Sequence, residues 1–186
     1  MTSAAAETGI PGYEAATWTI DPVHSEVGFS VRHMMVSKVR GRFGAFSGEI
    51  VTADDPAKSS VTAEIDLGSI NTGQEQRDAH IRSADFFEVE TYPTMTYKST
   101  GIRVEDGEYV LDGELTLKGV TKRVPLRLEI QGFGPDAYGG YRAGFTATGE
   151  LSRSDFNVNF NAAMETGGVV VGDKIQLHLE IEAVKA

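Results

Sequence analysis

The stretch Ile175-Gln-Leu-His-Leu-Glu-Ile181 alternates apolar and polar residues without a break. Successive side chains of a β-strand point to opposite faces, so this stretch predicts a strand with one buried and one solvated face. The same period of two returns along the chain, most clearly at Val27 to Val31, Val61 to Ile65 and Val124 to Ile130. Because turn residues separate these segments, the chain is predicted to be all-β.

A sheet built only of such strands has to bury its apolar face. The chain offers one short stretch of good helix formers, Gln74 to Phe87, which is too small to cover that face. We therefore predict a single antiparallel, lipocalin-like β-barrel of about eight strands, with one short helix near residues 74-85. The last strand, Lys174 to Lys185, should pair with the first, Thr17 to Asp21, and close the barrel.

Three local features refine this prediction. Val39 to Val51 is expected to form one long strand whose glycines introduce bends, and Lys122 to Phe133 is expected to form another. His33 to Lys38 breaks the alternation and predicts a turn. Thr72 precedes the helical stretch and is expected to cap it.

The chain has 186 residues, which suits one all-β domain. Residues 1-16 are predicted to be a flexible N-terminal tail, and residues 17-186 the barrel domain. The tail has neither the basic region nor the apolar region of a secretory signal, so we expect a cytoplasmic protein. No run of apolar residues approaches the length of a membrane span.

The formal net charge of −10 argues against a nucleic-acid partner, because a phosphate-binding surface needs clustered Lys and Arg. The same overall charge disfavours broad docking on anionic lipid. The chain has no cysteine, and its four histidines are dispersed without close carboxylates. We therefore expect no thiol chemistry, no metal site and no cofactor.

Several inward positions of the predicted strands carry small residues. They are Ser30, Ala63, Ser99, Gly113, Ala143 and Ala147. Protein interiors are close-packed, so small side chains around a barrel axis indicate room for a ligand. Large neighbours could equally fill these gaps, and the sequence leaves both alternatives open. If a cavity exists, its apolar walls favour a long apolar guest, since each buried methylene contributes about 0.8 kcal/mol.

Four ordered motifs carry a family resemblance. The string Trp18-Thr-Ile-Asp-Pro-Val-His-Ser-Glu-Val-Gly-Phe-Ser-Val-Arg-His33 resembles the opening signature of the YceI-like family of polyisoprenoid-binding proteins. Later stretches resemble the same family in the right order. They are Arg77-Asp-Ala-His-Ile-Arg-Ser-Ala-Asp-Phe-Phe87, Gly113-Glu-Leu-Thr-Leu-Lys-Gly-Val-Thr-Lys122, and Arg153-Ser-Asp-Phe156 with Val171-Gly-Asp173.

The resemblance implies an elongated, lipocalin-like barrel with a hydrophobic pore. It also implies a partner, a polyisoprenoid or another long-chain amphiphilic lipid. We therefore expect binding, storage or transport of such a lipid without covalent catalysis. Open sheet edges would also support a two-fold homodimer.

The residues expected to contact the ligand are motif-matched residues and inward aromatics. They are Phe29, Val31, Phe43, Phe86, Phe87, Met95, Tyr97 and Phe145, with His33 and Arg42 for a polar head group. Arg42 belongs to a run of cations without an acid among them, which also contains Arg32, Lys38 and Arg40. Such a run can receive an anionic head group, or it can simply keep the wet face of a strand soluble. Likewise, Arg77 and His80 can touch the head group or pair with loop residues such as Asp155.

Two other functions stay open. The chain could be an isomerase or hydrolase acting on a hydrophobic substrate in the same cavity, which would place a strongly perturbed Asp or His beside it. Ser154 and Asp155 alone do not indicate an esterase, because no G-x-S-x-G sequence surrounds them. Alternatively, a filled barrel could display the loop Arg153 to Gly172 to a protein partner, and it would contain no cavity.

Overall fold

The computed structural model describes residues 8–162 and 170–186. Their strands are β1 (Ala16–Ile20), β2 (Glu26–His33), β3 (Ser37–Phe43), β4 (Phe46–Thr52), β5 (Ser60–Asp66), β6 (Ile70–Asn71), β7 (Thr94–Glu105), β8 (Glu108–Leu117), β9 (Val120–Arg123), β10 (Leu126–Pro135), β11 (Tyr141–Ser152) and β12 (Val171–Lys185). Their helices are α2 (Glu75–Arg82) and three short 3₁₀ turns, η1 (Pro56–Lys58), η2 (Leu67–Ser69) and η3 (Arg153–Phe156).

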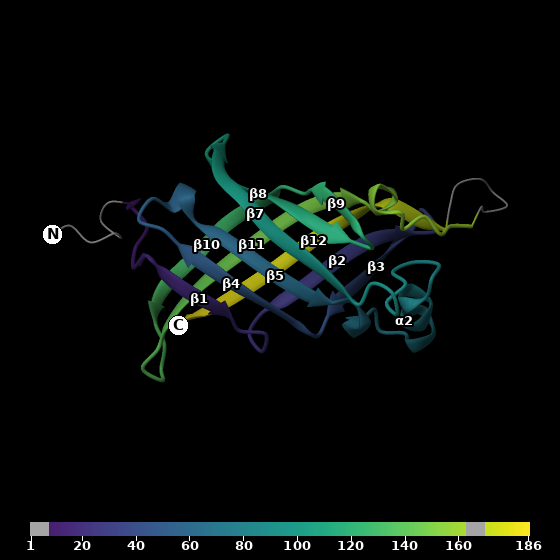
Figure 1. The fold of residues 1–186 in the computed structure, drawn as a ribbon, viewed down its shortest axis with the longest axis horizontal. Coiled ribbons are helices and arrows are strands. Elements are labelled where there is room, and N and C mark those ends of the chain that lie inside the picture. The colour runs from purple at the N-terminus through teal and green to yellow at the C-terminus, as the bar shows by residue number, and fades with distance from the viewer. Residues whose placement is uncertain (1–7, 163–169) are drawn as a thin grey trace.

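The strands form a closed antiparallel barrel, which confirms the predicted fold class (Figure 1). The ring runs through β1, β4, β5, β7, β8, β10, β11 and β12, and pairing of β1 with β12 closes it. The closing contacts include Trp18 opposite Lys185, so the first and last strands meet as predicted. Closure leaves one continuous inner face, which is where the alternating apolar side chains point.

At some places in the barrel wall, two shorter strands lie end to end and together do the work of one long strand. Strand β12 pairs with β2 from Val171 to Glu180 and with β1 from Ala183 to Lys185. In the same way, β3 pairs with β2 and β4 pairs with β1. The wall is therefore completed by broken strands that lie end to end.

Two segments that were each predicted to form one continuous strand are broken into two strands in the structure. The segment 39–51 breaks at Gly44, whose backbone N–H donates to Ser69 O instead of extending the ladder. The segment 122–133 breaks at Pro125, since proline has no backbone N–H to contribute. Each break lets the strand change direction while the sheet stays closed.

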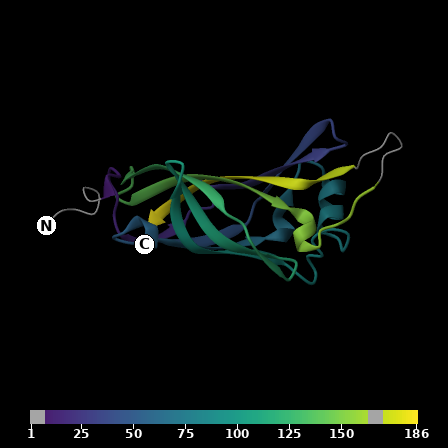
Figure 2. The ribbon, with the colours of Figure 1, turned by 90° about the horizontal axis from the view of Figure 1, so that it is seen from above.

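Helix α2 lies at one end of the barrel, opposite the end that carries the N-terminus (Figures 1 and 2). It stops at Arg82, so the helix is shorter than the predicted stretch, and Phe86 and Phe87 follow it in a turn. Thr72 does not cap it. The N-cap is Gln74, which makes no capping side-chain hydrogen bond, whereas Thr72 bonds to Asp78 inside the helix.

The N-terminal segment is ordered from further upstream than the predicted tail suggests. Tyr13 is buried, and its hydroxyl donates to Ala53 O at 2.5 Å. The hydroxyl of Tyr141 donates to Gly12 O at 2.5 Å and ties the same segment to β11. Residues 1–7 lie outside the described residues, so the prediction for them stays a prediction.

Candidate functional site

The barrel encloses a cavity of about 550 Å³. Its middle is walled by apolar side chains from strands all around the ring, for example Phe29, Val61, Ala63, Leu115, Leu128, Ala147 and Leu177. This contradicts the filled-barrel alternative. The volume falls in the range of sites that enclose small ligands, about 300 to 1,000 Å³.

Small inward residues and ring placement together keep this space open. Ala63 and Ala147 line the cavity, as the sequence predicts. A side chain at Gly113 would collide with the Tyr97 ring, so glycine lets that ring lie flat against the wall. Ser30 is different: its neighbours Phe29 and Val31 line the cavity, so its own side chain points outward, contrary to the prediction.

The polar group of the Tyr97 side chain is already used within the wall. Its hydroxyl donates to Val124 O at 2.8 Å, and burial raises the pKa of Tyr97 well above its ordinary value. The phenol is therefore neutral and satisfied. Across the described residues, no buried side-chain nitrogen or oxygen lacks a hydrogen-bond partner.

Aromatic rings pack together at the barrel end near Trp18, where Pro56, Ser59 and Ser60 also line the cavity. Trp18 is fully buried there against Phe133 and Tyr141, with ring centroids 5.5 and 6.0 Å apart respectively. Its indole N–H donates to Thr52 Oγ1 at 2.8 Å. Tyr13 adds its ring to Phe133 at 5.2 Å, so the N-terminal segment covers this end.

The other end, beside α2, is lined by cations and polarisable rings. Three arginines and two histidines contribute to the cavity wall there: Arg32, His33, Arg77, His80 and Arg153. No Asp or Glu of the described residues lines the cavity. In a chain of net charge −10, the mouth of the cavity is therefore a local region of positive potential.

Arg153 is the most buried of these cations, with 6 % of its surface exposed. Its guanidinium donates to four backbone carbonyl oxygens, those of Val158, Phe160, Val171 and Gly172, at 2.8 to 3.2 Å. Burial lowers the pKa of Arg153, but a guanidinium keeps its charge at neutral pH. Carbonyl dipoles satisfy the N–H groups without cancelling the charge, so the positive field persists at the mouth.

Helix α2 presents its two cavity-lining polar residues through a local network. Asp78 is buried and accepts hydrogen bonds from the backbone N–H and the hydroxyl of Thr72. Arg77 donates to Thr72 Oγ1 and O, at 2.7 and 2.8 Å. His80 pairs with Asp85 at 2.8 Å, so neither residue uses Asp155, the partner suggested by the sequence.

Phe86 and Phe160 pack beside His80 and form an aromatic rim at this mouth. The ring centroids of His80 lie 5.0 Å from Phe86 and 4.8 Å from Phe160. The guanidinium of Arg153 stacks 5.9 Å above the Phe86 ring. Because these cations pack against the aromatic rings, they do not fill the space between the apolar wall and the charged entrance.

The structure places almost all predicted ligand-contact residues in one wall. Those lining the cavity are Phe29, Val31, His33, Phe43, Phe86, Phe87, Met95, Tyr97 and Phe145. The exception is Arg42, whose prediction is corrected: it lies on the exposed outer face of β3, because its neighbour Phe43 points inward.

Sequence reasoning missed Arg153 as a residue of the mouth. Its motif with Ser154 and Asp155 drew attention to a nucleophile instead. In the structure the Ser154 backbone N–H donates to Asp173 Oδ1 at 3.0 Å, within the turn η3. No local signal marks Arg153, because Ser154 and Asp155 make its motif polar; the many acceptors that the buried guanidinium needs come from outside the motif.

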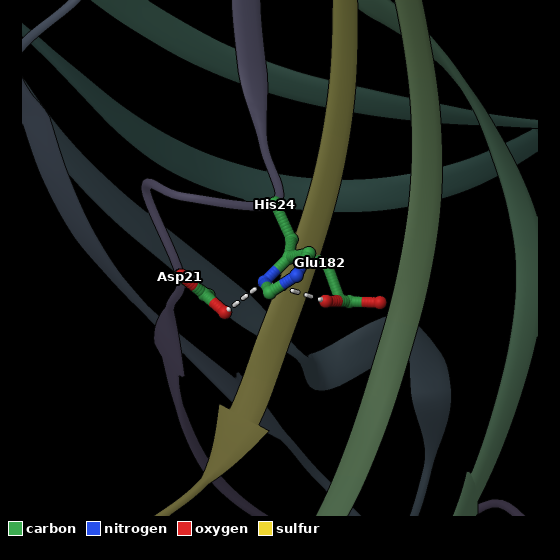
Figure 3. A group of neighbouring side chains, drawn as sticks. All are labelled: Asp21, His24 and Glu182. Atoms are coloured by element: carbon green, nitrogen blue, oxygen red, sulfur yellow. Dashed lines mark hydrogen bonds and ion pairs between the residues drawn. The ribbon is translucent and has the colours of Figure 1, made fainter. Parts of the chain in front are cut away.

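A second polar cluster lies on the barrel exterior (Figure 3). Asp21 and His24 come from the turn between β1 and β2 and Glu182 comes from β12; their ligand-type atoms lie within 4.8 Å of one another. Arg142 donates to Asp21 and Glu182 at 2.9 Å each, and to Asp136 at 2.9 Å. A divalent cation here would face that guanidinium, so the cluster is better explained as an ion-pair network that fastens the turn.

This network shifts the ionisation of its members. The hydrogen bonds from Arg142 and with His24 hold the pKa of Asp21 well below its ordinary value. The hydrogen bonds from Arg142 to Asp21 and Asp136 raise the pKa of Arg142. The network joins β1, β11 and β12, and it therefore reinforces closure of the barrel.

A closed antiparallel barrel with an apolar lumen and one charged mouth defines the lipocalin-like class of barrel proteins. The sequence matches the YceI-like domain family over residues 18–183, and the chain belongs to that family. It is 41 % identical over 146 residues to UPF0312 protein plu2095 of Photorhabdus laumondii, covering 77 % of this chain and 76 % of the relative. It is 34 % identical over 174 residues to Protein YceI of Salmonella newport, covering 92 % and 88 %.

Solved structures show the same fold. BcnA of Burkholderia cenocepacia superposes with a TM-score of 0.76 at 25 % identity, covering 88 % of this chain and 98 % of that one. A polyisoprenoid binding domain from Saccharophagus degradans superposes with a TM-score of 0.68 at 18 % identity, covering 93 % and 100 %. Among the described residues, no helix has the length and apolar character needed to cross a membrane.

Proposed function

We propose that this protein binds a long-chain isoprenoid or a similar amphiphilic lipid in the barrel cavity, for storage or transport and without covalent chemistry. The observation that carries the proposal is the wall itself, which is apolar along its middle and polar at its ends. Such a wall favours burial of a hydrocarbon chain and has no polar side chains along its middle to hydrogen-bond with that chain.

Burial of the tail would supply most of the binding free energy. A dozen buried chain carbons contribute about 10 kcal/mol at ~0.8 kcal/mol each, before the cost of immobilising the ligand. The cost of immobilising the ligand offsets part of this gain, so a longer buried tail should bind more tightly. Discrimination among tails then rests on length and shape, because apolar contacts are not directional.

The cations at the α2 end support an orientation for the ligand. Arg77 and Arg153 lie at a mouth whose wall contains no Asp or Glu of the described residues. An anionic or strongly polar head group would be stabilised there, with the tail directed toward the Trp18 end. The polyisoprenoid binding domain from Saccharophagus degradans, which has the same fold, supports this class of ligand.

The test is direct extraction combined with a blocked lumen. Purified protein is extracted with organic solvent, the extract is analysed by mass spectrometry, and binding of an added polyprenyl phosphate is titrated. Ala63→Phe places a ring in the cavity from β5, whereas Thr62→Phe places the same ring on the exposed outer face of the same strand.

The proposal predicts co-purified or added lipid on the wild type and on Thr62→Phe, and at least tenfold weaker binding by Ala63→Phe. Absence of lipid from the extract, together with no binding of polyprenyl phosphate, contradicts it. Turnover of a bound lipid ester or an isomerised product in the same extract would instead support the enzymatic alternative.

A further inference from the structure

The hairpin between β2 and β3 projects from the barrel at the α2 end (Figure 2). Its tip consists of three consecutive apolar residues, Met34, Met35 and Val36, which are 43, 51 and 85 % exposed. His33 lies at its base and lines the cavity mouth. The most exposed apolar loop tip near the cavity is thus also part of the entrance.

The backbone of this tip makes its composition unusual. Met34 and Met35 adopt positive φ values of 53° and 62°, and the Val36 N–H donates to His33 O. Turns with two consecutive positive φ values favour Asn, Asp and Gly, because a side chain is disfavoured there. Two methionines at these positions are therefore unfavourable for the fold, which points to a role outside it.

Two other hairpins of the same barrel serve as internal comparisons. They use the same pair of positive φ values at Asp106-Gly107 and at Lys118-Gly119. Both follow the expected turn chemistry with glycine at the second position. Of these three hairpins, the β2–β3 hairpin is the one that carries apolar residues at both positions.

Cations flank the apolar tip. Arg32, Lys38, Arg40 and Arg42 are exposed on β2 and β3, and Arg32 lies opposite Lys38 in the register. Within residues 8–162 and 170–186, none of these four forms an ion pair. An apolar tip flanked by cations without ion-pair partners suits an anionic lipid surface. The apolar residues can insert between the lipids while the cations contact lipid phosphates.

We infer that the β2–β3 hairpin is a docking device for an anionic phospholipid bilayer. Met34, Met35 and Val36 enter the interface while Lys38 and Arg40 meet lipid phosphates, which brings the cavity mouth against the membrane. A lipid tail could then pass between bilayer and barrel without crossing water. Docking itself does not depend on the proposed lipid cargo, because vesicle binding is measured separately from ligand binding.

The overall charge of −10 does not forbid this contact. Screening limits surface electrostatics to about 8 Å at physiological ionic strength, so a projecting hairpin is governed by its own charges. The neighbouring stretch of β12 carries Lys174, Gln176 and His178 before its first glutamate, Glu180. Its one acid nearer the mouth, Asp173, interacts electrostatically with the buried Arg153, which offsets part of its charge.

The experiment measures sedimentation of the full-length protein with vesicles of equimolar phosphatidylglycerol and phosphatidylcholine, and with vesicles of phosphatidylcholine alone. The double variant Met34→Asn/Met35→Gly restores the favoured turn residues and removes the apolar tip. It should lose at least tenfold in vesicle affinity without losing thermal stability. Lys38→Gln/Arg40→Gln should lose about thirtyfold on anionic vesicles.

A control removes exposed apolar residues elsewhere. Val23 and Tyr138 are 84 and 91 % exposed in other turns, and Val23→Ser/Tyr138→Ser should bind vesicles as the wild type does. The inference is overturned if wild-type protein ignores anionic vesicles, or if the Met34→Asn/Met35→Gly variant binds them unchanged. A dimer that the same variant abolishes, without vesicle binding, would assign the tip to a second copy of the chain instead.

Discussion

The two ends of this barrel are built from opposite chemistry. At the Trp18 end, aromatic rings pack edge to face, and Tyr13 and Gly12 of the N-terminal segment lie over them. At the α2 end, the cavity wall contains arginines and histidines, and the adjacent hairpin exposes methionines. A symmetric pore would need neither arrangement. The difference separates a packed floor, formed by Tyr13, Trp18, Phe133 and Tyr141, from a charged entrance at the α2 end.

The largest effect is expected from breaking the floor. Trp18→Ala removes a fully buried ring and should lower the free energy of unfolding by about 4 kcal/mol. Chemical denaturation measures this value. Tyr138→Ala removes an aromatic ring that is 91 % exposed and should stay within about 0.5 kcal/mol of the wild type. Equal losses in both variants would show that the Trp18 end is not a packed floor.

The second effect separates charge from geometry at the entrance. Arg153→Lys keeps a positive charge, but a lysine ammonium cannot reach four carbonyl oxygens in the pattern that the guanidinium does. We expect a loss of about 2–3 kcal/mol in unfolding free energy. Affinity for an anionic ligand should change less than stability, which a parallel ligand titration measures; a large affinity loss at unchanged stability contradicts this account.

A third change loosens the N-terminal segment that packs over the aromatic rings at the Trp18 end. Gly12 has a φ of +76°, and a Cβ there would lie 2.5 Å from Phe133 O. Gly12→Ala should therefore cost about 1–2 kcal/mol and expose Tyr13 to solvent. Hydrogen exchange of the 8–16 segment reports this directly. The matched variant Gly139→Ala also places a side chain at a positive φ, but the space around it is open. It therefore measures the cost of backbone strain without a steric collision.

The smallest effect concerns pH. The pKa of Asp21 is depressed in the folded protein, so its ion pair with Arg142 stabilises above the unfolded pKa of about 3.9 and is lost as pH falls further. Asp21→Asn should lower stability by about 1 kcal/mol at neutral pH and reduce the fall in stability between about pH 5 and pH 2. Asp106→Asn, in a turn that also accepts asparagine, should leave the pH profile unchanged. An identical profile for both variants would remove Asp21 from the network.

Much of the inner surface could be predicted from the period of two. Once Val27 and Phe29 are assigned inward, the positions of Val31 and His33 follow, and the structure places all four in the cavity wall. The same parity applied to Phe43 would have placed Arg42 outside. That error came from weighing charge without orientation.

Other features depend on contacts that no local pattern encodes. The breaks at Gly44 and Pro125 allow strands to share the wall, which only the closed topology requires. Burial of Tyr13 arises from a segment with little alternation, and the carbonyls around Arg153 come from residues that meet only after β12 is in place. Long-range packing decided the burial of Tyr13 and the surroundings of Arg153, whereas the break at Pro125 also has a local cause in the missing backbone N–H of proline.

The central claim, that the lumen buries a lipid tail, is tested most directly by a chain-length series. Affinities are measured for linear polar-headed lipids that differ by single methylenes, in wild-type protein and in Ala63→Phe. The account predicts a rise of about fourfold per added carbon, until the tail reaches the Trp18 floor, and an earlier plateau in the variant. An affinity that is independent of chain length, or equal plateaus in both proteins, would contradict it.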